Sequence, residues 1–165
     1  INFEERYETA KEIQSICNKW NATLVVNNDH RIAELIGCGL HIGQDIEDTS
    51  FLKEAKNISF VGLSCKNKTE HQARKDAELF SYYSFGPLFE SKTKKNITGP
   101  IDIVDVSSKM DKEKINIAIG GISEINLRLV KQSKFNMAAI CDGIYNDLKK
   151  IEVNCRKLIE IWNEN

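Results

Sequence analysis

The sequence predicts an α/β fold in which repeated strand–helix units form a parallel sheet. Short apolar runs end in small, polar or charged residues, and amphipathic segments separate them. Apolar runs that alternate with helical patterns are typical of parallel strands joined by helices. The six runs are Thr23–Asn27, Leu40–Gly43, Ile58–Ser64, Tyr83–Gly86, Ile115–Gly121 and Met137–Asp142. Chemistry in such folds lies at the carboxyl ends of the strands.

The number of units suggests an incomplete (β/α)8 TIM barrel. Consecutive parallel strands with helical crossovers curl with one hand, and eight units close a barrel. The chain has 165 residues, which is short for a closed barrel of about 250. We interpret residues 1–165 as a single barrel domain. Because the sequence begins with Ile1 rather than Met, we expect two strands and one helix of the barrel to precede it.

The composition argues against several classes of partner. The 23 basic and 24 acidic residues nearly cancel, so no electrostatic case exists for nucleic acid or an anionic membrane. No apolar run approaches the roughly 20 residues of a membrane span. Five cysteines without CxxC spacing predict reduced thiols in the cytoplasm rather than a disulfide framework or a zinc site. The sequence leaves the oligomeric state open, and a homo-oligomer is compatible with it.

Helices are expected between the apolar runs, with Asp29 capping the second and Ser123 capping the sixth. Residues 3–20 carry apolar side chains every three or four residues, which predicts one long amphipathic helix. The expected helices cover 3–20, 31–37, 51–56, 69–80, 101–110, 124–133 and one continuous stripe over 144–162.

A polar loop after the fourth apolar run is the first candidate site. Ser91, Thr93, Lys94 and Lys95 combine hydroxyls with cations, and this set suits an oligophosphate. The alternative is a solvated basic loop.

The glycine pair Gly120-Gly121 is the second candidate site. Two glycines between a buried strand and a helix let backbone N–H groups approach an anion at the helix N-terminus. The alternative is an ordinary strand-to-helix turn.

The first and second apolar runs also end in polar residues. Asn27, Asn28 and Asp29 could bind a diphosphate and share a divalent cation, or Asp29 could only cap the next helix. Asp45 could add a metal ligand or be a surface acid. His41 and Gln44 are candidate substrate contacts, although a lone histidine on a strand is more often a core residue.

Three further residues lie where strands are expected to end. Ser64 is expected to donate a hydrogen bond into the mouth of the barrel, and no partner makes it a nucleophile. We expect Cys141 to be a packed thiol. Asp142 would repel a phosphate placed beside it.

Several segments, in this order, resemble the thiamine phosphate synthase family and its close relative, thiazole tautomerase. The matching segments are VVNND, LHIGQD, FVGLS, FGPLFESKTKK and IAIGGIS. The resemblance implies a (β/α)8 barrel and a cytosolic transferase of thiamine biosynthesis. It also implies phosphorylated pyrimidine and thiazole substrates, release of diphosphate, and Mg²⁺ as cofactor.

The resemblance assigns roles residue by residue. It implies that Asn27 or Asn28 binds the diphosphate, with Asp29 at the metal. Ser64 and Lys94 would contact the departing diphosphate. The remaining residues that it implies are contacts for the thiazole phosphate, namely Ser91, Thr93 and Gly121.

Departures from the family pattern keep two other functions open. Ile46 stands where the family has its second metal carboxylate, and Asp142 replaces a phosphate-binding serine. These changes favour a barrel that binds thiazole or thiamine phosphate without turnover. Pro87 replaces the tautomerase histidine, although an isomerase that uses Asp142 or Glu90 as a base is a third interpretation.

Overall fold

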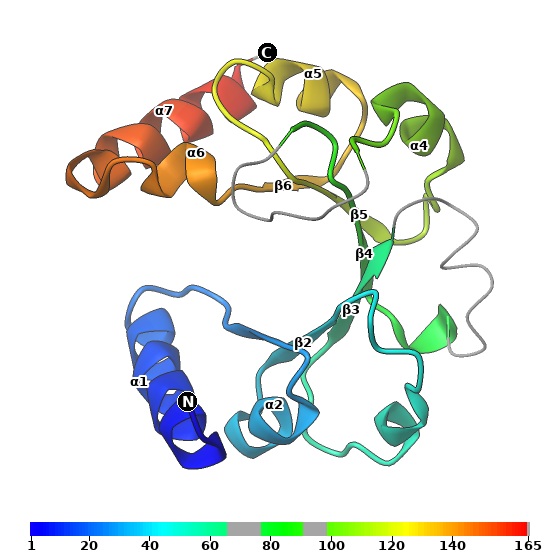
Figure 1. Ribbon diagram of the computed structural model, residues 1–165, viewed down its shortest axis with the longest axis vertical. Helices are drawn as coiled ribbons and strands as arrows, with labels where there is room; N and C mark the ends of the chain where they lie inside the picture. Colours follow the sequence, from blue (N-terminus) through cyan, green and yellow to red (C-terminus); the bar gives the residue numbers. More distant parts are fainter. Residues whose placement is uncertain (66–76, 91–98, 165) are drawn as a thin grey trace. The chain divides into compact units, whose positions relative to one another are not determined.

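The computed structural model describes residues 1–65, 77–90 and 99–164. They group into two compact units, of which the first takes residues 1–64 and 77–81 and the second takes 65, 82–90 and 99–164. In Figure 1 the blue-to-cyan elements belong mainly to the first unit and the green-to-red elements to the second. Among the described residues, no helix combines the length and apolar character that crossing a bilayer requires.

The first unit contains three parallel strands in chain order. Its residue pairs include Asn27 with His41 between the first two strands, and His41 with Gly62 between the second and third. The carboxyl ends of these strands therefore lie at one edge. The elements are α1 (Phe3–Lys19), β1 (Val25–Asn27), α2 (His30–Ile36), β2 (Gly39–Ile42), η1 (Ser50–Lys53), β3 (Val61–Cys65) and η2 (Ala77–Leu79).

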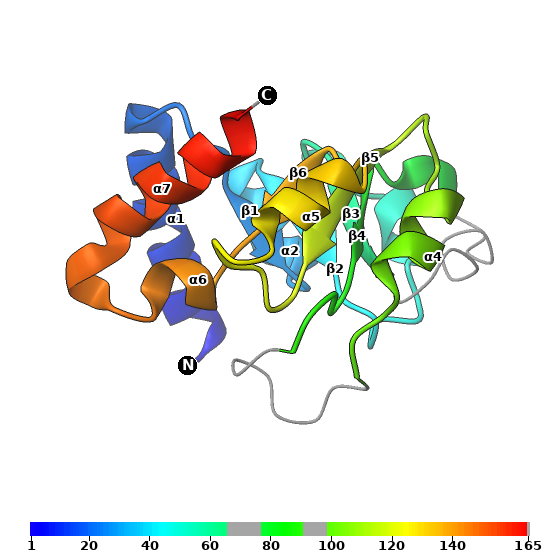
Figure 2. The same cartoon turned by 90° about the horizontal axis from the view of Figure 1, so that it is seen from above.

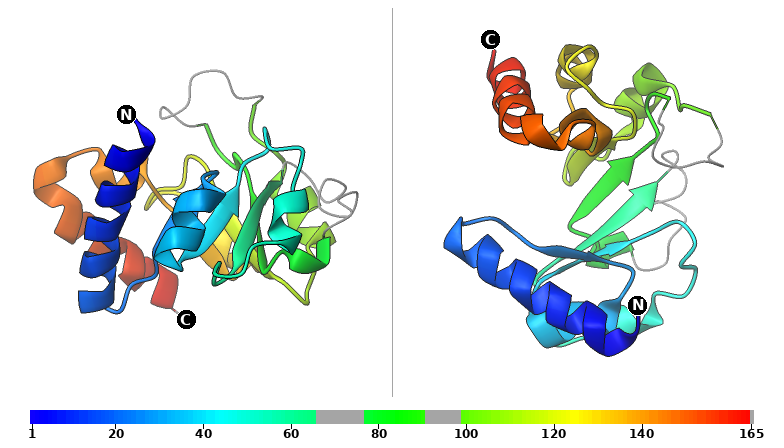
Figure 3. Two further views of the ribbon diagram at one scale, coloured as in Figure 1. Left: turned by 90° about the horizontal axis from the view of Figure 1, so that it is seen from below. Right: turned by 60° about the vertical axis from the view of Figure 1, so that its left-hand side comes forward.

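Helix α1 begins where the sequence predicts and runs beside α2 (Figure 3). The Asn2 side chain accepts a hydrogen bond from the Glu5 N–H, and the Glu5 carboxylate accepts one from the Asn2 N–H, which forms a capping box. The Arg31 guanidinium lies 4.7 Å from the centre of the Phe3 ring. These contacts join the starts of the two helices at the edge where the strands end.

The second unit repeats the parallel pattern with three further strands. Phe85 pairs with Ala118, and Ala118 pairs with Ala138. Helix α7 packs against α5 and α6 (Figure 2). The elements are β4 (Tyr82–Phe85), α4 (Ile103–Lys109), β5 (Ile115–Ile119), α5 (Leu127–Gln132), β6 (Met137–Ala139), α6 (Asp142–Tyr145), η3 (Leu148–Lys150) and α7 (Ile151–Asn163).

Each unit has its own apolar core. In the first, the strands bury side chains of the apolar runs and α2 adds two more, namely Leu40, Ile42 and Leu63 from the strands and Ile32 and Ala33 from α2. In the second, the Phe85 and Phe135 rings lie 6.4 Å apart between centroids. Burial of each large apolar side chain stabilises a unit by roughly 1.5–3 kcal/mol before conformational entropy is counted.

Three of the expected helices differ from the structure. The helix expected over 51–56 is the short 3₁₀ helix η1. The helix expected over 124–133 begins at Leu127, and its N-cap is Asn126 rather than Ser123. The stripe expected to be one helix over 144–162 is divided into α6, η3 and α7, because Asp147 adopts an extended backbone and its side chain caps η3. Residues 69–76 of the fourth expected helix lie outside the described residues.

Candidate active site

The ends of β1 and β2 are joined through Asn28. Its backbone adopts a left-handed conformation with φ of 64°, which Asn tolerates better than most residues. The Asn28 N–H donates to the His41 carbonyl oxygen at 2.8 Å, and Asn28 Oδ1 accepts from the Gly43 N–H at 2.6 Å. The amide oxygen therefore binds the Gly43 backbone, and the amide lies against Gly43, because a Cβ added there would be 3.1 Å from both Oδ1 and Nδ2.

The ends of β2 and β3 are joined by a second side-chain contact. His41 Nε2 lies 2.8 Å from Ser64 Oγ, and both side chains are half-buried. His41 is thus a hydrogen-bonded residue at the strand ends rather than an apolar core residue. Ser64 takes the position at the end of its strand that the sequence predicts, within the first unit.

Asp29 has two partners in the structure. Asp29 Oδ1 accepts from the Ile32 N–H at 3.3 Å, which confirms that Asp29 caps α2. Asp29 Oδ2 lies 3.1 Å from Arg6 Nη2 of α1, and the Asp29 side chain is only 14% exposed. The Asp29 carboxylate is therefore already neutralised by a protein cation.

The described residues do not form a metal site. Asp45 is exposed and Ile46 follows it. Within residues 1–65, 77–90 and 99–164, no three histidine, cysteine or acidic side chains gather in a group that could hold a metal ion. With Asp29 paired to Arg6, the predicted ligands Asp29 and Asp45 do not fit Mg²⁺ by themselves.

Two glycines, Gly120 and Gly121, follow the end of β5 in the second unit. Gly120 and Gly121 both have positive φ, at 94° and 65°. The Leu88 N–H donates to the Ile119 carbonyl oxygen at 3.0 Å, and the Phe89 N–H donates to the Gly120 carbonyl oxygen at 3.1 Å. A Cβ added at Gly121 would lie 2.3 Å from the carbonyl oxygen of Glu90. The segment that leads into the lysine-rich loop therefore lies directly on the glycine turn.

The lysine-rich loop itself cannot be placed from the structure. Ser91, Thr93, Lys94 and Lys95 lie outside the described residues. The described residues that precede them, up to Glu90, contact Gly120-Gly121.

The helix after the glycine turn begins later than the sequence predicts. The Asn126 side chain accepts from the Ser123 N–H at 2.9 Å and donates to the Gly121 carbonyl oxygen at 3.0 Å. This turn separates Gly121 from Leu127, where α5 begins. The predicted anion site must therefore rest on the backbone of the glycine turn and not on a helix N-terminus.

Cys141 and Asp142 lie at the start of α6, and both are exposed. The expectation that Cys141 is a packed thiol is wrong, because β6 ends at Ala139 and the chain turns outward before α6. All five cysteines are free thiols.

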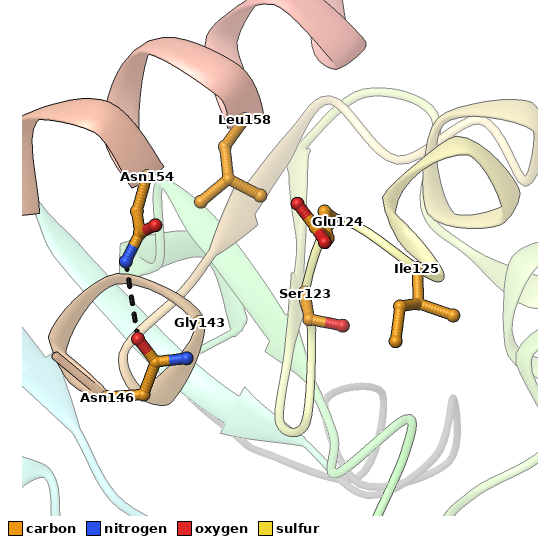
Figure 4. Close-up of a pocket in the computed structure, with 7 residues that line it drawn as sticks. All are labelled: Ser123, Glu124, Ile125, Gly143, Asn146, Asn154 and Leu158. Atoms are coloured by element: carbon orange, nitrogen blue, oxygen red, sulfur yellow. Dashed lines mark hydrogen bonds between the residues drawn. The ribbon is translucent and has the colours of Figure 1, made fainter. Parts of the chain in front are cut away.

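A pocket of about 210 Å³ in the second unit lies between the β5–α5 turn and the helices α6 and α7 (Figure 4). Asn154 Nδ2 donates to Asn146 Oδ1 at 3.3 Å and to the Ile144 carbonyl oxygen at 3.1 Å. Glu124 on the rim pairs with Lys157. Neither glycine of the Gly120-Gly121 turn lines this pocket, which is formed by Ser123, Glu124, Ile125, Gly143, Asn146, Asn154 and Leu158.

The sequence gives no local signal for two of the residues that organise the first unit. Arg6 lies on an amphipathic helix among other charged residues, and nothing in its spacing indicates Asp29 as its partner. The sequence predicts only that Gly43 ends a strand, whereas in the structure the Gly43 N–H donates a hydrogen bond to Asn28 Oδ1. Both contacts depend on strand and helix packing.

Comparisons with known proteins agree with the predicted fold and family. The model of the family described as thiamine monophosphate synthase matches residues 1–144. Thiamine-phosphate synthase 1 of Streptococcus pneumoniae is 28% identical over 159 residues, which cover 94% of this chain and 75% of the relative. Thiamine-phosphate synthase of Nitrosococcus oceani is 29% identical over 167 residues, covering 96% and 75%.

A solved structure supports the fold independently. Thiamine phosphate pyrophosphorylase from Pyrococcus furiosus matches with a TM-score of 0.80 at 20% identity, covering 99% of this chain and 80% of that protein. At this identity the likeness concerns the fold. It confirms the predicted parallel α/β fold of the TIM-barrel type.

Proposed function

Because the chain belongs to the thiamine monophosphate synthase family, we propose that it is a transferase of thiamine biosynthesis. It couples hydroxymethylpyrimidine diphosphate to a thiazole phosphate and releases diphosphate. The structural observation that supports this most is the Asn28 amide at the end of β1, whose oxygen is held by the Gly43 N–H and whose Nδ2 group is able to donate to an anion. We expect the enzyme to act in the cytoplasm.

The reaction needs stabilisation of a departing anion. The bond between the pyrimidine methylene carbon and the diphosphate oxygen breaks, and its electron pair leaves with the diphosphate. The thiazole nitrogen then donates its lone pair to the methylene carbon and forms the new C–N bond. Hydrogen-bond donors and cations that face the leaving oxygens lower the barrier, because negative charge develops there in the transition state.

We assign the diphosphate to donors of the first unit. The Asn28 amide and the Ser64 hydroxyl lie at the carboxyl ends of β1 and β3, and each is held by a neighbouring strand end. Asn27 and Gln44 are proposed as further contacts to this substrate. Lys94 is proposed as the cation that contacts the departing diphosphate.

We assign the thiazole phosphate to the second unit. Glycine at positions 120 and 121 permits a left-handed turn on which residues 87–90 pack closely, and backbone N–H groups of this turn are proposed to donate to the phosphate. Ser91 and Thr93 are proposed to donate their hydroxyls to the same phosphate. Cys141 and Asp142 remain proposed contacts, and the Asp142 carboxylate would weaken phosphate binding by like charge.

Mg²⁺ is the cofactor that the family resemblance implies, and among the described residues no three histidine, cysteine or acidic side chains gather to hold it. Arg6 already neutralises Asp29, and Asp45 is exposed. We therefore assign no step to a metal. A titration of turnover with Mg²⁺ and with a chelator measures directly whether the reaction depends on it.

The test is synthesis of thiamine phosphate by the purified full-length protein from the two phosphorylated substrates, followed by chromatography and by diphosphate release. We expect one diphosphate per thiamine phosphate. Lys94→Ala should lower turnover by at least about 100-fold with an unchanged unfolding midpoint. Wild-type protein that forms no thiamine phosphate, with Mg²⁺ present, would refute the proposal.

One observation favours a second function, a barrel that binds the phosphates without turnover. Asp29, the acid that the resemblance assigns to the metal, is paired with Arg6, and Ile46 stands where a second carboxylate is expected. Calorimetry separates the two functions. Tight binding of a thiazole phosphate, independent of Mg²⁺ and without product, would favour the binding protein.

A further inference from the structure

The positions of the heavy atoms do not show which of His41 and Ser64 donates the hydrogen bond between them. His41 Nε2 and Ser64 Oγ are 2.8 Å apart. A neutral imidazole has one nitrogen that donates and one that accepts, and a hydroxyl has one hydrogen to donate and lone pairs to accept with. The distance between these two atoms therefore fits either group as the donor.

A bound diphosphate removes this freedom. Its deprotonated oxygens only accept hydrogen bonds, so a serine that contacts one of them must use its single hydrogen for the phosphate. Ser64 Oγ can then keep its bond to His41 only by accepting from Nε2–H. We infer that His41 is a positioning residue that donates from Nε2 to Ser64 Oγ and so directs the Ser64 hydroxyl hydrogen toward the diphosphate. This inference rests on the proposed function, because it takes diphosphate as the ligand of Ser64.

The strand geometry explains how the two side chains meet. His41 on β2 is paired in register with Gly62 on β3. Ser64 lies two residues beyond Gly62, and side chains two residues apart on a strand share one face. Gly62 places no side chain between them, so the imidazole can extend along the sheet toward the end of β3. Both side chains are half-buried, which strengthens a hydrogen bond relative to one in bulk water.

The first test is the tautomer of His41 when diphosphate is bound. Protein with ¹⁵N-labelled histidine is titrated with inorganic diphosphate, and the His41 signals are assigned with the His41→Gln variant. We expect Nε2 to carry a proton in the bound state. A bound state in which Nε2 is unprotonated overturns the inference, because Ser64 would then be donating to His41.

The second test uses a matched pair of substitutions. His41→Gln keeps an N–H donor at similar reach, whereas His41→Leu removes the donor and keeps bulk. We expect His41→Leu to lower kcat/KM about 10- to 100-fold, and His41→Gln to retain activity within about fivefold of wild type. Equal losses in the two variants would overturn a donor role.

A double-mutant cycle decides whether His41 acts through Ser64. In a Ser64→Ala protein, His41→Leu should lower kcat/KM by less than about twofold further, since the hydroxyl to be positioned is gone. Losses that multiply independently would overturn the inference. Unfolding midpoints identify any variant that does not fold, and in that case the tautomer measurement on folded wild-type protein still decides.

The outcomes also separate this inference from the proposed function. Wild-type protein that makes thiamine phosphate while the cycle shows independent losses overturns the inference alone. Wild-type protein that binds diphosphate without turnover overturns the proposed function, and the tautomer of the bound state still tests His41. Wild-type protein that neither turns over nor binds diphosphate overturns both.

Discussion

The strand ends of the two units are organised by different means. In the first unit, side chains reach from one element to the next, as in Asn28 to Gly43 and His41 to Ser64. In the second unit, the backbone of residues 88–90 lies directly on Gly120-Gly121. A substitution at a side-chain contact can remove a single hydrogen bond. A substitution at Gly120 or Gly121 adds a Cβ where the backbone of residues 87–90 already lies. Substitutions should therefore cost more in the second unit than in the first.

The largest effect is expected for Gly121→Ala. Alanine is strained at φ of 65°, and its Cβ would meet the Glu90 carbonyl oxygen. We expect a loss of about 3 kcal/mol in the free energy of unfolding, measured by urea denaturation. Gly99→Ala is the matched control, because a Cβ there has nothing within 4 Å. Equal stabilities of the two variants would show that the glycine turn tolerates a side chain.

Substitutions of Asn28 should have a smaller effect on stability, and its size should depend on which atoms of the amide are lost. Asn28→Ala removes the acceptor for the Gly43 N–H, and we expect a loss of about 1 kcal/mol in unfolding free energy. Asn28→Asp keeps the acceptor and replaces the N–H donors with negative charge. Its stability should stay near that of wild type while its affinity for diphosphate falls by about tenfold or more in calorimetry. Unchanged affinity would remove Asn28 from the proposed site.

A smaller effect is expected for the Arg6–Asp29 ion pair. Arg6 is half-exposed, so Arg6→Gln should lower the unfolding free energy by only about 0.5 kcal/mol. Asp29→Asn loses the ion pair but keeps an oxygen that can cap α2, and its loss should be similar. Asp29→Ala also loses the cap and should cost about 1 kcal/mol more. A loss for Asp29→Asn as large as that for Asp29→Ala would place the main role of Asp29 in the ion pair.

The last prediction concerns alkaline pH. Burial raises the pKa of Tyr82 to about 12, above its ordinary value of 10. Between these values the unfolded chain loses the phenol proton while the folded chain keeps it, so stability should fall as pH rises from about 10 to about 12. Tyr82→Phe should reduce this slope in urea denaturation measured at several pH values. An unchanged slope would show that Tyr82 titrates alike in both states.

Local signals predict many of the elements correctly. The apolar period predicts α1 to within a few residues, and the cap at Asp29 predicts α2. The choice between Ser123 and Asn126 as a cap is harder, because both are good capping residues. Asn126 occupies the N-cap position of α5 without a capping side-chain hydrogen bond, because its side chain binds the turn before it, at Ser123 and Gly121.

The last helix shows where periodicity fails. An apolar stripe continues through residues 144–162, and it gives no sign that the chain bends between Asn146 and Asp147. The Asn154 side chain donates to the Ile144 carbonyl oxygen, which holds the start of α7 against α6. This bend depends on contacts that form only after the helices pack.

The sequence by itself determined the alternation of parallel strands and helices, the residues at the strand ends and the family, because each depends on short-range period and composition. Tertiary structure alone decided which of those residues meet. Asn28 and Gly43 are 15 positions apart, and His41 and Ser64 are 23 apart. Their contacts depend on the register between neighbouring strands, which many weak long-range contacts set together and which no short segment encodes.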